Sequence, residues 1–237
     1  MRKKTINMDC FNCESRLHSV FCKISDNDVL NVNLNKNRFV YNKGDILFHR
    51  DTLPLGIFII EKGKVKIYKY AGNGRDQIVR LTKPGDIIGY RALLNSRPYS
   101  STAEAIEETV VCFLSKDLFM DIMKNNNSVN ENILKLMTKE LDHTETLLCE
   151  NHFKSVRARV ADMILYIKEK YGFEKDNITI NITLSRSDLS SLVGTATETL
   201  IRTLITLKEE QIIDFSGKRI QIKDQKKLIQ AAQRKES

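Results

Sequence analysis

The stretch that most constrains this chain spans residues 184–210, where two short helical patterns are separated by a glycine. Each pattern opens on a capping box, in which a hydroxyl residue is followed three positions later by an acidic one: Ser185 with Asp188, and Thr195 with Glu198. Gly194 breaks the chain between them, and leucines at helical spacing give the second pattern one apolar face. Two helices around a glycine turn predict either a helix-turn-helix, whose second helix enters a DNA major groove, or an ordinary packed helical hairpin.

A basic hairpin pattern follows directly. Isoleucine-rich runs at residues 212–213 and 220–222 flank a turn that carries Lys218 and Arg219. A helix-turn-helix followed by such a hairpin is a winged helix, so the context favours the DNA-binding interpretation. The charge agrees, because residues 153–237 carry 16 Lys and Arg against 11 Asp and Glu, a net of +5 out of the chain's +8. A basic balance favours an anionic partner.

Residues 38–119 show a different pattern, of short β-rich runs separated by glycine-containing turns. Runs of this kind, spaced by about 8–12 residues, are typical of an antiparallel β-barrel or β-roll. The whole chain is therefore predicted to be α+β, with a β-roll first and a winged helix-turn-helix last.

Between these two parts, a long helical pattern runs from about residue 128 to residue 152. One row of side chains recurs in steps of three and four, the 3.5-residue repeat of a coiled-coil seam. The row consists of Leu134, Met137, Leu141, Thr144 and Leu148. We expect this helix to pack on the roll and on its twin in a homodimer; the alternative is a helix buried within one chain.

Three cysteines, Cys10, Cys13 and Cys22, lie close together near the N-terminus. Thiolates two residues apart can hold one metal ion or one cluster, and His18 or Cys112 could supply a fourth ligand. The reducing interior of a cell would keep such cysteines as thiols or ligands rather than disulfides. That compartment is expected, since the sequence contains neither a signal peptide nor a run long enough to span a membrane. No nucleophile elbow, phosphate loop or metalloprotease motif is present, so we expect a cytoplasmic protein that is not an enzyme.

The order of β-roll, long helix and winged helix resembles the Crp/Fnr family of bacterial transcription regulators. Its specific parts here are Lys43-Gly44-Asp45, the run 59–65, the run 83–89 and the two halves of the helix-turn-helix, 184–189 and 197–202. The resemblance implies a cysteine-containing N-terminal segment (1–24), a cyclic-nucleotide-binding-like sensor roll (25–125), a dimerisation helix (126–152) and a winged helix-turn-helix DNA-binding domain (153–237).

The resemblance also implies which residues contact DNA. Glu198 and Arg202 match the family's base-reading positions, and Thr197 and Ile201 match its variable reading positions. Arginine can bond guanine and glutamate can accept from cytosine. Four further residues are expected to contact phosphates: Ser185, Arg186, Lys218 and Arg219. The expected partners are a near-palindromic double-stranded operator with half-sites roughly 34–36 Å apart, a second copy of the chain, and RNA polymerase, with no membrane.

The sensed signal is less constrained. Nucleotide-binding members carry a glutamate and an Arg-Ser pair, where this chain has Tyr90 and Tyr99-Ser100, so cyclic AMP is not expected to bind. Oxygen-sensing members hold a [4Fe-4S] cluster with three N-terminal cysteines and one in the roll, which implies Cys10, Cys13, Cys22 and Cys112 here. The spacing before Cys22 departs from that pattern, with eight intervening residues rather than five. The resemblance thus indicates a response to oxygen, redox state or nitric oxide; haem, an organic effector, zinc or thiol redox chemistry remain the alternatives.

Overall fold

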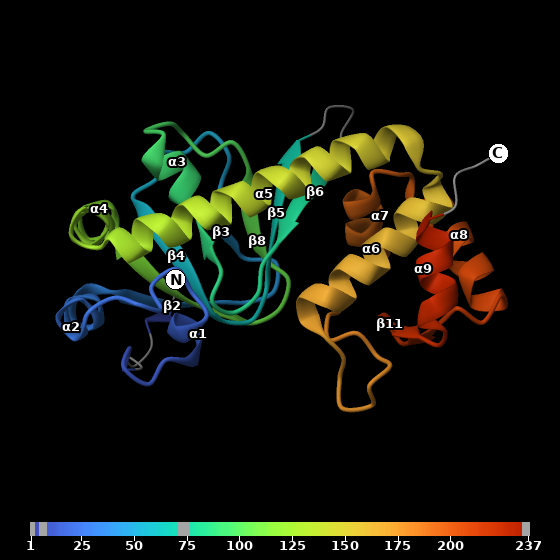
Figure 1. Ribbon diagram of the computed structural model, residues 1–237, viewed down its shortest axis with the longest axis horizontal. Coiled ribbons are helices and arrows are strands. Elements are labelled where there is room, and N and C mark those ends of the chain that lie inside the picture. Colours follow the sequence, from blue (N-terminus) through green and yellow to red (C-terminus); the bar gives the residue numbers. More distant parts are fainter. Residues whose placement is uncertain (1–2, 5–8, 71–75, 234–237) are drawn as a thin grey trace. The chain divides into compact units, whose positions relative to one another are not determined.

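The computed structural model describes residues 3–4, 9–70 and 76–233, and for residues 3–4 and 149–152 it describes the backbone alone. The chain divides into two compact units (Figure 1). The first consists of Met1–Ala71 with Ile78–Glu140, and the second of Leu141–Ser237 with Gly72–Gln77. Each unit is described by itself below.

The first unit is built on two antiparallel sheets, with strand orders β1-β2-β9-β4-β7 and β3-β8-β5-β6. Side chains from both sheets meet in one core that includes Phe48, Phe58, Val65 and Val111. The strands are β1 (Lys3–Lys4), β2 (Asn37–Tyr41), β3 (Ile46–Phe48), β4 (Gly56–Lys62), β5 (Val65–Tyr70), β6 (Asp76–Leu81), β7 (Ile87–Ile88), β8 (Thr102–Ala105) and β9 (Thr109–Ser115). The predicted antiparallel roll is thereby confirmed.

A second core of the first unit lies between the N-terminal segment and the helices that follow the roll. Phe21 packs edge-on against Phe119, with ring centroids 6.3 Å apart, and Val129 and Ile133 join the same cluster. The helices of this unit are α1 (Glu14–Leu17), α2 (Asp26–Asn35), α3 (Tyr90–Leu94), α4 (Lys116–Asn125) and the first part of α5 (Asn127–Phe153). The N-terminal segment is thus a packed part of the first unit.

Helix α5 confirms the long helix expected from the sequence, and it presents two different faces. Ile133 is buried against the roll side, whereas Leu134, Leu141 and Leu148 are 64%, 58% and 60% exposed. Met137 and Thr144 lie exposed in the same row. The 3.5-residue row is therefore exposed in the single chain. The alternative, a long helix buried within one chain, would require these side chains to be covered.

The second unit is a small helical domain with a two-stranded hairpin. Its elements are the end of α5, α6 (Val156–Tyr171), α7 (Arg186–Val193), α8 (Thr197–Glu209), β10 (Ile213–Ser216), β11 (Arg219–Ile222) and α9 (Gln225–Gln233). Helix α6 contacts α7, α8 and α9, and buries Val160, Ile164 and Ile167. The predicted winged helix-turn-helix is present, with β10 and β11 paired antiparallel as the wing.

Two local predictions in this unit are wrong. The alternating isoleucines of residues 178–182 predict a short strand, but Thr179 and Ile180 make only isolated bridges, to Gln221 and Phe173 respectively. The segment exchanges two backbone hydrogen bonds with β11, from Ile180 to Ile220 and from Ile222 to Ile178, and the Asp176 carboxylate also accepts bonds from the backbone and the hydroxyl of Thr179.

The second capping box is also absent. Helix α8 has Ala196 as its N-cap, with no side-chain cap hydrogen bond, so Thr195 and Glu198 do not form the reciprocal pair. Nowhere in residues 9–70 and 76–233 does a helix have the length and apolar character to cross a membrane.

Candidate functional site

Both ends of α7 are defined by local features of the sequence. Ser185 caps α7 in a capping box with Asp188, as predicted, with a distance of 3.0 Å from the Asp188 amide to the Ser185 hydroxyl. Gly194 ends the helix in the left-handed region at φ +71°, which a residue with a Cβ rarely adopts. This explains why a glycine separates the two helical patterns.

Helix α8 has one buried and one exposed face. Leu200, Leu204 and Leu207 are buried, as the sequence predicts. Glu198, Ile201, Arg202 and Ile205 lie on the opposite, exposed face. Thr197 differs from the other predicted reading residues, because its hydroxyl lies 2.9 Å from the hydroxyl of Ser190 across the turn.

The predicted phosphate-contacting residues lie at the start of α7 and in the wing, and they differ in their contacts. Lys218 is exposed at the tip of the wing. Arg219 is engaged, since its guanidinium donates to Glu174 at 2.8 Å and to the Thr183 hydroxyl at 3.0 Å. The guanidinium of Arg186 lies over the Phe215 ring, 4.5 Å from its centre, and burial lowers the pKa of this group. Of these cations, Lys218 is the one most available to an anion.

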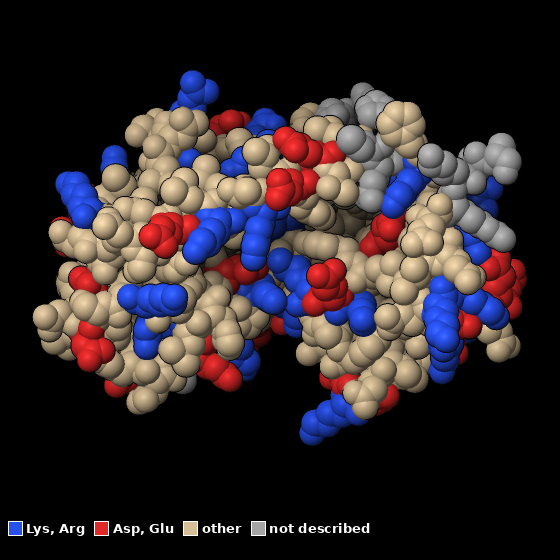
Figure 2. Space-filling model, viewed as in Figure 1, with Lys and Arg blue, Asp and Glu red and all other residues tan. Residues whose placement is uncertain are grey.

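Charges are mixed elsewhere on the surface. On the face shown in Figure 2, Lys and Arg side chains alternate with Asp and Glu. On this face an anion would therefore be bound by individual residues and not by a large field of one sign.

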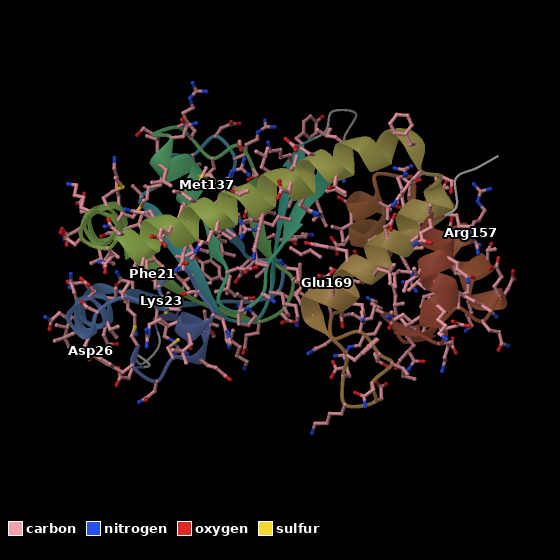
Figure 3. The ribbon with its side chains drawn as sticks, viewed as in Figure 1. Phe21, Lys23, Asp26, Met137, Arg157 and Glu169 are labelled. Carbon is pink, nitrogen blue, oxygen red and sulfur yellow. The ribbon has the colours of Figure 1, made fainter. Side chains whose placement is uncertain are left out.

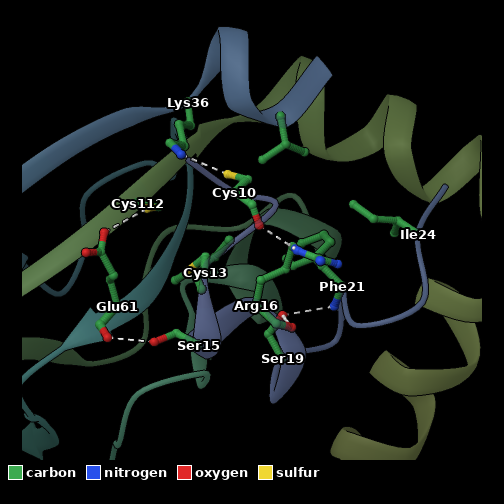
Figure 4. Close-up of a pocket in the computed structure, with 12 residues that line it drawn as sticks. Cys10, Cys13, Ser15, Arg16, Ser19, Phe21, Ile24, Lys36, Glu61 and Cys112 are labelled. Carbon is green, nitrogen blue, oxygen red and sulfur yellow. Dashed lines mark hydrogen bonds between the residues drawn. The ribbon is translucent and has the colours of Figure 1, made fainter. Parts of the chain in front are cut away.

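Three of the four predicted cluster ligands line one small cavity in the first unit. Cys10 and Cys13 come from the N-terminal segment and Cys112 from β9, 102 residues away from Cys10 in the sequence (Figure 4). The cavity volume is about 30 Å³, which is room for roughly one water molecule. All four described cysteines are free thiols.

Charged side chains contact two of these sulfurs. The Lys36 ammonium donates to Cys10 Sγ at 2.8 Å and to Asn33 Oδ1 at 2.9 Å, and the lysine is buried (Figure 4). Cys112 donates to Glu61 Oε2 at 3.5 Å, and Arg38 binds the same carboxylate. Burial raises the pKa of the Cys10 thiol although Lys36 acts in the opposite direction.

The pKa of Cys112 is raised to about 12, first by burial and then by the Glu61 carboxylate. Both thiols therefore stay protonated at neutral pH as long as nothing binds them. A metal group would have to displace these protons, as thiolate ligation always requires.

Cys22 lies apart from this cavity. Its sulfur accepts a bond from the Asn132 amide on α5 at 3.8 Å, and the same amide donates to Val20 at 3.1 Å. The segment that carries Phe21 and Lys23 thus lies along the first turns of α5 (Figure 3). Among the described residues, no group of three or more His, Cys, Asp or Glu side chains has an arrangement able to hold a metal ion.

Two protein-family models match the chain. Residues 38–126 match the cyclic nucleotide-binding domain, and residues 158–231 match the Crp-like helix-turn-helix domain. This pairing of a nucleotide-binding-like roll with that particular helix-turn-helix decides the family. The chain belongs to the Crp/Fnr family.

The names of proteins similar to this Crp/Fnr protein refer to different signals. The chain is similar to an "Anaerobic regulatory protein" of Pasteurella multocida, with 27% identity over 191 residues, which cover 79% of this chain and 69% of the relative. It is also similar to a "CRP-like cAMP-activated global transcriptional regulator" of Mycobacterium tuberculosis, with 25% identity over 177 residues, covering 74% and 79%. The structure of FixK2 from Bradyrhizobium japonicum matches with a TM-score of 0.73 at 25% identity, covering 83% of this chain and 96% of that one. One of these names refers to anaerobic regulation and another to activation by cAMP, so the shared fold does not identify the signal.

In this Crp/Fnr protein, aromatic side chains fill the positions where the nucleotide contacts of related rolls are expected. Tyr99 is buried and stacks on Phe48, with ring centroids 3.9 Å apart. Tyr90 is buried and donates to Glu140 on α5 at 2.9 Å. At these two positions the chain therefore has buried tyrosines instead of the glutamate and the arginine that the resemblance associates with nucleotide binding.

Sequence reasoning did not find Lys36, Glu61 or Asn132 as neighbours of the cysteines. Their contacts join residues 26, 51 and 110 positions apart. No motif or spacing links such pairs, so only the fold brings them together.

Proposed function

We propose that this regulator is a homodimer that binds a near-palindromic DNA operator through α8 and the wing. The observation that carries the proposal is the exposed face of α8, where Glu198 and Arg202 stand on a helix anchored by three buried leucines. Arginine can donate two hydrogen bonds to guanine, and glutamate can accept from cytosine, in the major groove. The candidate phosphate contacts lie at the start of α7, Ser185 and Arg186, and in the wing, Lys218 and Arg219.

The exposed row on α5 supports the homodimer. Isolated apolar side chains on a surface are common, but a row at the coiled-coil repeat over several turns is typical of a helix that packs on another helix. A parallel copy would cover Leu134, Met137, Leu141, Thr144 and Leu148 together. RNA polymerase, the further partner expected of such a regulator, stays a prediction.

We propose that the cavity formed by Cys10, Cys13 and Cys112 is the sensor site, for oxygen, redox state or nitric oxide. The donor chemistry fits an iron–sulfur cluster at these three positions, since thiolates are its usual ligands. The cavity, which has room for roughly one water molecule, would have to widen to hold it. Cys22 fits less well, because it is held by Asn132 outside the cavity. When bound, a cluster would supply the reactivity toward oxygen or nitric oxide; the name of the Pasteurella relative supports an anaerobic role.

The chain itself offers a route from the cavity to α5. Phe21 and Ile24 line the cavity and also belong to the core that contains Val129 and Ile133 of α5. Filling or emptying the cavity would move its wall, and hence the segment that Asn132 and Ser128 tie to α5. A shift of the α5 pair between two arrangements would then change the population able to bind DNA.

DNA binding is tested by Arg202→Ala, with Lys226→Ala, an exposed lysine on α9, as the matched control. Loss of a bidentate guanine contact in each protomer is expected to weaken operator binding by at least tenfold, since each such contact discriminates by about 1–3 kcal/mol. Fluorescence anisotropy on an operator selected from randomised duplexes measures this. Unchanged affinity for Arg202→Ala, or no selected sequence at all, would refute the DNA-reading role of α8.

The sensor site is tested by anaerobic purification with iron and sulfide assays on the wild type, Cys112→Ser and Cys22→Ser. Cys112→Ser should lose iron. Retention of iron by Cys22→Ser would assign the site to three cysteines, and loss would make Cys22 the fourth ligand after a movement away from Asn132. An iron-free wild-type protein that still changes its DNA affinity on thiol oxidation would replace the cluster with a thiol switch in the same cavity.

A further inference from the structure

The exposed face of α8 contains an apolar side chain between its two charged ones. Ile201 is 40% exposed and directly precedes Arg202, one helical turn after Glu198. The leucines of the same helix are buried in the domain core, so Ile201 has no role in that core. An isoleucine kept on the face that meets a ligand indicates an apolar feature in the ligand.

Thr197 is not expected to contact such an apolar feature. Its hydroxyl is 2.9 Å from that of Ser190, and it stands at the first position of α8. The threonine therefore ties the start of α8 to α7 across the turn. The side chains left to read bases are Glu198, Ile201 and Arg202.

The chemistry of the major groove limits what Ile201 can contact. Guanine, cytosine and adenine are distinguished there by hydrogen-bonding groups, whereas thymine adds a 5-methyl group beside its oxygen, the one large apolar group in the groove. An isoleucine pressed against a cytosine amine would leave that donor without a partner and out of water, which is unfavourable. Thymine is the base that an exposed isoleucine matches.

We propose that Ile201 selects a thymine in each half-site by packing on its 5-methyl group, at a base pair next to the G·C pair that Arg202 and Glu198 contact. The inference rests on the proposed DNA binding and deepens it, because it names a base that a charged residue cannot specify.

Ile205 provides a matched control within the same helix. It is 48% exposed, one turn further from the N-terminus of α8. Four residues of helix correspond to about 6 Å along the axis, and recognition helices contact base edges mainly with their N-terminal residues. Ile205 is therefore expected to lie beyond the bases that Ile201 reaches.

The test replaces thymine by deoxyuridine, which removes the 5-methyl group and leaves every hydrogen bond of the base pair. Each thymine of a selected operator is replaced in turn, and binding is measured by fluorescence anisotropy with wild-type protein, Ile201→Ala and Ile205→Ala. At one thymine per half-site, uracil should weaken wild-type binding about fourfold, the effect of exposing one buried methyl group. Ile201→Ala should lose this sensitivity and Ile205→Ala should keep it.

The outcomes separate this inference from the function it rests on. If an operator is selected and Arg202→Ala weakens its binding at least tenfold, but no thymine shows a methyl effect that depends on Ile201, the inference is wrong and DNA binding stands. If no operator is selected, both are wrong. Since Ile201 is exposed, Ile201→Ala should fold normally, and circular dichroism with thermal unfolding checks this.

Discussion

At the scale of single residues, the four described cysteines have different environments. Cys10 and Cys112 are buried and their pKa values are raised, whereas Cys13 and Cys22 are half-buried. The thiolate is the nucleophile in alkylation, so burial and a raised pKa both slow the alkylation of Cys10 and Cys112.

We therefore expect iodoacetamide to modify Cys13 and Cys22 of the reduced, metal-free protein before Cys10 and Cys112. Peptide mass spectrometry over a time course measures the four rates. In denaturant the four rates should converge, which is the control for accessibility. Equal rates in the native protein would contradict the buried positions of Cys10 and Cys112.

The sequence predicted the cysteines as a group but not their surroundings. Chemistry and family resemblance named Cys10, Cys13 and Cys112, which the fold brings to one cavity. The contact between Lys36 and Cys10 depends on the path of the chain after α2, and no local signal encodes it. Cys22 shows the limit most clearly, because its environment is decided by Asn132, 110 positions later.

At the scale of elements, regular periodicity was the reliable signal. The roll strands, α5 and the leucine face of α8 all follow from repeats of two, 3.5 or 3.6 residues. The failures lie where the pattern is weak: α2 was not predicted, since it buries only Val29 and Val32 among many asparagines. Residues 178–182 alternate like a strand but lack a continuous partner.

The α5 seam gives a prediction at this scale. Leu141→Glu should convert the homodimer to monomer, because it removes a leucine from each copy and places two negatively charged glutamates opposite each other. Burial of a leucine contributes about 1.5–3 kcal/mol, so the dimer Kd should rise by at least about a hundredfold. Sedimentation velocity measures the change.

Lys139→Glu is the control, since Lys139 is exposed on α5 outside the seam row. It should leave the dimer intact. A dimer that survives Leu141→Glu, or dissociates equally with Lys139→Glu, would rule out the seam as the interface.

At the scale of the whole molecule, the salt dependence of DNA binding should report which cation of the wing contacts a phosphate in each protomer. Each phosphate contact releases counterions, so the logarithm of the binding constant falls linearly with the logarithm of salt concentration. Lys218→Ala should reduce that slope by about 2 in a dimer, one contact per protomer. Arg219→Ala should change it less, because Glu174 already neutralises this arginine.

Titrations of the same operator from low to high potassium chloride provide the slopes. A larger effect for Arg219→Ala than for Lys218→Ala would mean that Arg219 leaves Glu174 when DNA binds. The double variant Arg219→Ala, Glu174→Ala distinguishes that case, since removing both partners leaves the net charge of the site unchanged.

The uncovered row on α5 also has a consequence for gene dosage. If only paired chains hold an operator, occupancy at low abundance varies with the square of the number of chains, by mass action. A twofold change in synthesis would then alter promoter occupancy about fourfold. The same apolar seam that joins two protomers would make the regulator respond steeply to its own supply.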